Sequence, residues 1–259
     1  MQKKILKFSL LFLSLLVSFF AWLSVSNAIT VVNYSVWLVP MTWFSLVYIL
    51  FSLEFILIPE KLWCGLSILL GFFLSLFFVP NFWHLGFLFI ASIILFVAYR
   101  QIKNDLSSRV KLCVPKNLQA GKTFFVLALA LAISSQYYFQ AKAIGLLKLP
   151  AFDAGVILNN NWTKELLYKL SPDLQKMGDE NLTIFMNQKI QSLISPNYAN
   201  EKFPIIPISM AVVLFLTVLS LGAFGVRFLV HLVNFVFWLL ILTKVVSVKK
   251  IPVEMEVIE

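Results

Sequence analysis

Four polar side chains stand in segments of the chain that are otherwise apolar. Glu54 lies one turn inside the end of one such segment. Arg227, His231 and Asn234 are spaced i, i+4, i+7 in another, so they share one helix face. Polar groups at membrane depth are expensive unless they are paired, and we expect Glu54 to pair with Arg227 or His231. The functional interpretation of such a cluster is a proton path, an ion path or a polar substrate pocket. The sequence favours the structural interpretation, in which Arg227 is a surface anchor, His231 and Asn234 make helix contacts, and Glu54 reaches the interface.

The tripeptide Gly121-Lys122-Thr123 matches the last three residues of a phosphate-binding P-loop. That motif also needs a glycine five positions earlier and a preceding strand, whereas Lys116 occupies the position here and a polar segment precedes it. Lys122 more simply reaches lipid headgroups from the start of an apolar helix. We therefore expect no nucleotide and no other cofactor.

Other candidates for catalysis or metal binding are sparse. The chain has two histidines and two cysteines, and it lacks the zinc-protease and serine-hydrolase motifs. His84 follows an uncharged turn, and we interpret it as a hydrogen-bonded residue rather than a metal ligand. The sequence thus favours a non-enzymatic protein without a metal site. A membrane-embedded enzyme acting on a lipid, with a site built from scattered residues, is the third alternative.

The elements that must position these residues are apolar segments of membrane-spanning length. Of 259 residues, 60% are hydrophobic and 13% are charged, and the mean hydropathy is +0.90. The apolar blocks hold roughly 17 to 23 residues, which suits helices crossing a hydrocarbon core about 30 Å thick. We predict an all-α, polytopic membrane helix bundle with about seven transmembrane helices. There are six if the first segment is a cleaved signal or if one segment does not span.

Four regions are expected along the chain. Residues 1–140 hold five apolar segments and a basic loop at 100–122, and residues 141–203 form an external loop of short amphipathic helices. Residues 204–248 form a transmembrane hairpin that turns at Arg227, and residues 249–259 are a polar tail.

Basic residues near the segment ends predict the orientation. The loop at 100–122 carries six basic residues against one acid, so this loop and the N-terminus are expected in the cytoplasm and residues 141–203 outside. The net charge of +9 is then explained by lipid headgroups, and we expect no nucleic acid as a partner. Seven spans would place the tail outside, yet its lysines favour the inside, so its side stays open.

Small residues repeat at helical spacing on two segments and predict close contacts between helices. They are Ser67, Gly71 and Ser75 on the third segment, and Ala128, Ala132 and Ser135 on the fifth.

The functional expectation follows from the external loop. Its apolar stripes lie on helices of under about 15 residues, which are unstable alone and must bury that face. One stripe in residues 179–194 includes Leu182, Phe185 and Met186. We expect a non-enzymatic membrane component whose loop 141–203 docks on a partner or on the membrane surface. The alternative is a small-solute or ion transporter or channel that uses Glu54 with the Arg227, His231 and Asn234 stripe.

Overall fold

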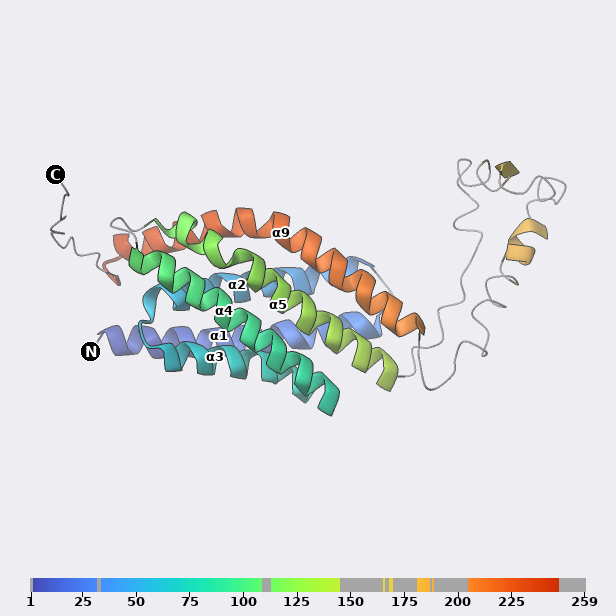
Figure 1. The fold of residues 1–259 in the computed structure, drawn as a ribbon, viewed down its shortest axis with the longest axis horizontal. Coiled ribbons are helices and arrows are strands. Elements are labelled where there is room, and N and C mark those ends of the chain that lie inside the picture. Colours follow the sequence, from blue (N-terminus) through green and yellow to red (C-terminus); the bar gives the residue numbers. More distant parts are fainter. Residues whose placement is uncertain are drawn as a thin grey trace, which may run out of the picture. The chain divides into compact units, whose positions relative to one another are not determined.

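Helices form all of the regular secondary structure in the part of the chain that the structure describes. This computed structural model describes residues 2–31, 34–108, 113–144, 165, 168–169, 181–186, 188 and 205–246. Its main elements are α1 (Gln2–Thr30), η1 (Tyr34–Trp37), α2 (Leu38–Leu57), α3 (Lys61–Phe73), η2 (Leu74–Phe77), α4 (Phe82–Ser108), α5 (Val114–Ala143) and α9 (Ile205–Leu242) (Figure 1). The predicted all-α class is confirmed.

Five of these helices are long and apolar enough to cross a membrane: α1, α2, α4, α5 and α9. A shorter apolar helix covers Lys61–Phe77. Within the described residues the count of long apolar helices is therefore five, not the expected seven.

The largest difference from the sequence prediction lies at the C-terminal end. Instead of a hairpin within residues 204–248, one uninterrupted helix of 38 residues, α9, passes through Arg227. At 1.5 Å per residue such a helix is about 57 Å long, nearly twice the thickness of a hydrocarbon core. The expected turn rested on a single charged residue, and arginine is a good helix former that leaves the backbone hydrogen bonds intact.

The basic segment 100–122 is also more helical than expected. Helix α4 continues to Ser108 and α5 begins at Val114, so the connection between them shrinks to residues 109–113. Pro115 is tolerated in the first turn of α5 because a backbone N–H is not needed there.

Gly121 lies inside α5, where it lets α5 approach α4 closely. A β-carbon at this position would lie 2.7 Å from the carbonyl oxygen of Ala98 and 2.8 Å from Cγ1 of Ile102. The residues that resemble a P-loop therefore form a helix interior and a packing contact. No loop that could surround a phosphate exists there.

The chain divides into two units. The first is Met1–Gln140 with Ala211–Glu259, and the second is Ala141–Met210. In the second unit residues 181–186 are helical, with Leu182 buried. This helix falls within the stripe predicted for residues 179–194. Most of the expected external loop 141–203, and the tail 249–259, lie outside the described residues.

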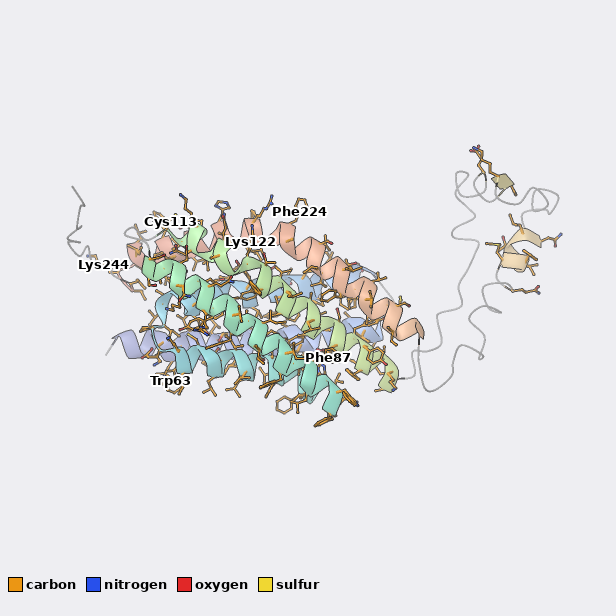
Figure 2. The ribbon with its side chains drawn as sticks, viewed as in Figure 1. Trp63, Phe87, Cys113, Lys122, Phe224 and Lys244 are labelled. Atoms are coloured by element: carbon orange, nitrogen blue, oxygen red, sulfur yellow. The ribbon has the colours of Figure 1, made fainter. Side chains whose placement is uncertain are left out.

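Helices of the first unit alternate in direction (Figure 1). Helices α1, α3 and α5 run one way, and α2, α4 and α9 run the other way. One end of the bundle consequently holds the start of α1, the α2–α3 connection, the end of α4 and the start of α5. Lys244, just after α9, lies toward the same end as Cys113 (Figure 2).

Aromatic side chains fill the centre of the bundle. Tyr48 and Phe125 lie edge to face with ring centroids 4.6 Å apart, and Phe55 and Tyr99 lie similarly at 5.3 Å. Phe51, Phe55 and Phe125 are buried almost completely. These contacts hold α2 against α4 and α5 and so fix the position of Glu54, which lies in the same stretch of α2.

Candidate functional site

Glu54 is the acidic side chain buried most deeply among the described residues. It is fully buried near the end of α2, and it is approached by Ser14 of α1 and Ser67 of α3. The Ser14 hydroxyl is hydrogen-bonded to Oε1 of Glu54, and the Ser67 hydroxyl lies 3.3 Å from the same oxygen. The two hydroxyl oxygens are 3.3 Å apart. Side chains from α1 and α3 thus meet at one carboxyl oxygen of α2.

The second oxygen of Glu54 has a different environment. Oε2 is buried and has no hydrogen-bond partner among the described residues. No basic side chain in this part of the chain forms an ion pair with it. An ionised carboxylate in such a place would be strongly destabilising, because burial removes its hydration without supplying a counter-charge.

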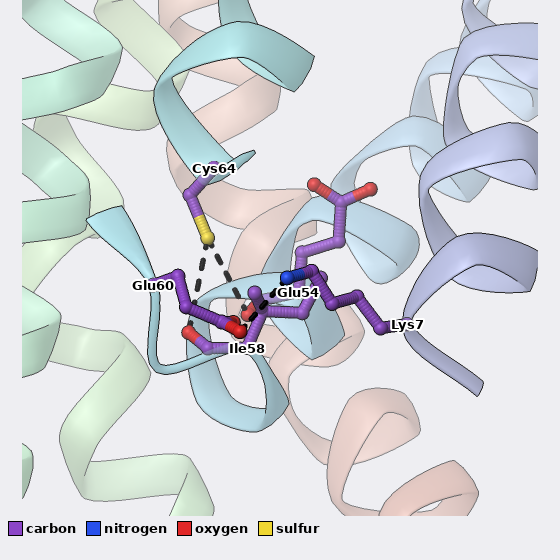
Figure 3. A network of polar contacts seen from close by, with 5 residues as sticks. All are labelled: Lys7, Glu54, Ile58, Glu60 and Cys64. Carbon is purple, nitrogen blue, oxygen red and sulfur yellow. Dashed lines mark hydrogen bonds and ion pairs between the residues drawn. The ribbon is translucent and has the colours of Figure 1, made fainter. Parts of the chain in front are cut away.

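An ion pair lies at the end of the bundle next to this site. Nζ of Lys7 is 2.8 Å from Oε1 of Glu60 in the α2–α3 connection, and it lies 4.7 Å from the ring centroid of Trp63. Figure 3 shows Lys7 reaching Glu60 across this end, beside Cys64. The hydrogen bond from Lys7 holds the pKa of Glu60 below its ordinary value.

Cys64 links the site to the connection through weak contacts. Its sulfur lies 3.9 Å from the carbonyl oxygen of Glu54 and 3.8 Å from that of Ile58. The thiol is fully buried, as expected for a structural cysteine, and Cys113 is half-buried.

The predicted cluster of four polar residues is not assembled. Arg227, His231 and Asn234 all lie on the exposed side of α9, and Glu54 is bound by serines. The buried side of α9 is a neighbouring stripe one residue earlier in register. It consists of Val226, Val230, Val233 and Phe237. Both stripes have helical spacing, and packing selects the apolar one because valine and phenylalanine fill the space against the bundle better.

Sequence reasoning missed the partners of Glu54. A lone serine such as Ser14 in an apolar helix is common, and the spacing of Ser67 indicates only a small packing residue. Their proximity to Glu54 depends on contacts across 40 and 13 positions of the chain. The available signal is a serine in an apolar segment near an acid that needs a hydrogen-bond donor.

The predicted small-residue stripes are buried, and some members also form hydrogen bonds. A β-carbon at Gly71 would lie 2.9 Å from Cζ of Phe51, so this glycine is a close contact. Ala128 and Ala132 are fully buried on α5. Ser75 and Ser135 instead contact His84.

His84 is held by hydrogen bonds on both ring nitrogens, which confirms its predicted hydrogen-bonded role. Nε2 lies 2.8 Å from Oγ of Ser75, and Nδ1 lies 3.0 Å from Oγ of Ser135. Ser135 donates its own proton to the carbonyl oxygen of Ala132, so it must accept from Nδ1–H. Ser75 then donates to Nε2. Both Ser75 and His84 are fully buried, which leaves no access for a substrate and favours a structural link between η2, α4 and α5.

Metal binding finds no support in the described residues. They contain no group of three or more histidine, cysteine, aspartate or glutamate side chains that could hold a metal ion. Comparison with known proteins adds no assignment: neither a family model, a curated protein nor a solved structure matches the chain. The function must therefore be argued from the chain's own geometry.

Proposed function

We propose that this chain is a non-enzymatic, multi-pass membrane protein that works as a subunit of a membrane assembly. The contact with its partner is made by the exposed side of α9. Residues 141–203 supply a second contact, with a partner or with the membrane surface. The single observation that carries the proposal is that large apolar side chains are exposed in the second half of α9, residues 228–242.

The level of α9 in the bundle is set by one close contact. A β-carbon at Gly222 would lie 2.5 Å from Cγ1 of Val126 in α5. Val126 is one turn from Lys122, and α9 runs opposite to α5 (Figure 1). Arg227 therefore lies near the level of Lys122, where a basic residue would meet lipid headgroups. The following 15 residues extend α9 by about 22 Å beyond that level.

This second half of α9 exposes large apolar side chains. Phe228 is 72% exposed, Phe235 53% and Trp238 51%. Past the headgroup level such side chains would face water, and covering three of them by about 100 Å² each is worth roughly 7 kcal/mol. A partner helix would provide that cover. Arg227, His231 and Asn234 on the same exposed side favour a partner that carries acidic or amide side chains.

The transporter alternative draws less support from the geometry. It treated Glu54 and the stripe on α9 as one site, whereas Glu54 is enclosed by α1 and α3 and the stripe points away from the bundle. An assembly role needs only the exposed stripe.

We also propose that the N-terminus, the 109–113 connection and the end of α9 face the cytoplasm, with residues 145–204 outside. This orientation puts Lys7, Lys103, Lys122 and Lys244 on the cytoplasmic side, as basic residues near helix ends favour. The continuous α9 supports this orientation for the tail, because one helix in place of a hairpin would return the chain to the side that its lysines favour.

The test is site-specific cross-linking in the native membrane. A benzophenone amino acid replaces Phe235, and the matched control replaces Phe77, which is 77% exposed on η2. We expect one discrete protein adduct from position 235, which Arg227→Ala weakens, and no such adduct from position 77. Adducts with lipid alone at both positions would overturn the assembly role. A chain lacking residues 156–200 that keeps the same adduct and the same stability would refute the contribution of the loop.

A further inference from the structure

We propose that Glu54, Ser14 and Ser67 form a proton-binding site inside the bundle, with an exchangeable proton on Oε2 of Glu54. The inference is independent of the assembly role, because it concerns α1, α2 and α3 and not the exposed side of α9.

The geometry separates the two carboxyl oxygens. Ser14 and Glu54 are fully buried and Ser67 is 2% exposed. Both hydroxyls lie against Oε1, and the Ser14 hydroxyl also lies 3.0 Å from the carbonyl oxygen of Leu11. A serine hydroxyl has a single proton to donate, so Ser14 donates to one of these two oxygens at a time. Ser67 donates to Oε1, which makes Oε1 the hydrogen-bond acceptor of the site. Oε2 has no partner among the described residues, so it is the oxygen free to hold a ligand.

A positive ligand is required because the carboxylate has no counter-charge. Moving such an ion from water into a medium of low dielectric constant is strongly unfavourable, and much of that cost remains after the protein relaxes. Two serine hydroxyls offset only a small part of it as hydrogen bonds to a charged group. Neutralisation at the carboxyl itself therefore dominates.

The charged and titratable groups on neighbouring elements do not supply that neutralisation. Lys7 of α1 is paired with Glu60. Cys64 of α3 contacts the backbone carbonyl of Glu54, not its carboxyl. On α4 the Lys103 ammonium lies 5.9 Å from the ring centroid of Tyr99. The other basic side chains described on α3, α4 and α5 face away from the site. Lys61, Arg100, Lys116 and Lys142 are exposed, and Lys122 is half-buried.

A proton fits the site better than a metal cation. The side chains offer four oxygens, two from Glu54 and one from each serine, whereas Mg²⁺ and Ca²⁺ take at least six oxygen ligands. A proton needs only one. Glu54 lies one turn from the end of α2. We therefore expect its proton to exchange with solvent through the α2–α3 connection, beside Lys7 and Glu60.

Infrared spectroscopy of the full chain in lipid nanodiscs tests the site. Wild type minus Glu54→Gln should show the carbonyl stretch of a protonated carboxylic acid at neutral pH. The band should shift in heavy water because the proton exchanges. Glu60→Gln, which removes an exposed acid, should leave it unchanged. Ser67→Ala should move the band to higher frequency, because the carbonyl oxygen loses a hydrogen bond.

Two results would overturn the proposal. One is a carboxylate stretch in place of the acid band at neutral pH. The other is an acid band that disappears when sodium chloride replaces choline chloride, which would make the ligand a sodium ion. If Glu54→Gln does not fold, a frequency shift between wild type and Ser67→Ala assigns the band to Glu54. If that shift is absent, the site is refuted.

Discussion

Replacing Gly121 with alanine tests the closest contact between α4 and α5. The added carbon would lie 2.7 Å from the backbone oxygen of Ala98 and 2.8 Å from Cγ1 of Ile102. A side chain can rotate away, but a backbone oxygen cannot, so the two helices must separate. In a helix interior, replacing glycine with alanine by itself raises the free energy of unfolding by roughly 1 kcal/mol. Overpacking costs about 1–3 kcal/mol, and the backbone contact places this case in the upper half of that range.

We therefore expect Gly121→Ala to lower the free energy of unfolding by about 1–2 kcal/mol. Gly86→Ala in α4 is the matched control, because a β-carbon there meets nothing within 4 Å. In the control, the free energy of unfolding should rise by roughly 0.5–1 kcal/mol. Unfolding of both variants in one detergent, followed by circular dichroism, gives the comparison. If Gly121→Ala were stabilised as much as Gly86→Ala, the close approach of α4 and α5 would be wrong.

Two further predictions concern the Lys7–Glu60 ion pair and the orientation of the chain in the membrane. Because the hydrogen bond from Lys7 lowers the pKa of Glu60, this pair stabilises the fold above the unfolded pKa of the carboxyl, and the effect is lost as pH falls through the folded value. The difference in Tm between wild type and Glu60→Gln should accordingly narrow on acidification, and a widening difference would contradict the pairing. An impermeant maleimide on intact cells should label Asn160→Cys but neither native thiol. After permeabilisation it should label Cys113 and spare Cys64, which is fully buried. Labelling of Cys113 in intact cells would reverse the proposed orientation.

Helix positions were largely predictable because the signals are local. The five apolar segments predicted within residues 1–140 correspond to helices of the bundle, including α1, α2, α4 and α5, with only shifted ends. The ends moved because apolar length reports the part of a helix that suits hydrocarbon, whereas the helix itself continues through polar residues such as Arg100 and Lys103. The predicted hairpin at Arg227 was wrong for the same reason, because a charged residue marks a change of polarity and not a break in the helix backbone.

The candidate site was predictable only in part. Glu54 stood out because an acid in an apolar segment is rare and expensive. Its actual partners did not stand out, because Ser14 and Ser67 are ordinary serines in apolar helices and meet Glu54 only in the folded bundle. The expected partners on α9 were wrong because two stripes there have equal periodicity, and only packing chooses between them. Ser75 and Ser135 likewise gained a hydrogen-bonding role only when the fold placed His84 between them.

The sequence by itself determined that this is an all-helical chain with membrane-length apolar segments, and it marked Glu54 as the acid that needs a partner. These properties depend on residue type and on spacing within one helix turn. Only the tertiary structure decided that Ser14 and Ser67 meet Glu54, that Gly121 is a packing contact, and that the polar stripe of α9 is exposed. Each of these depends on which helix faces join. That choice is made by side-chain packing over the whole bundle, because helical spacing leaves several faces equally available.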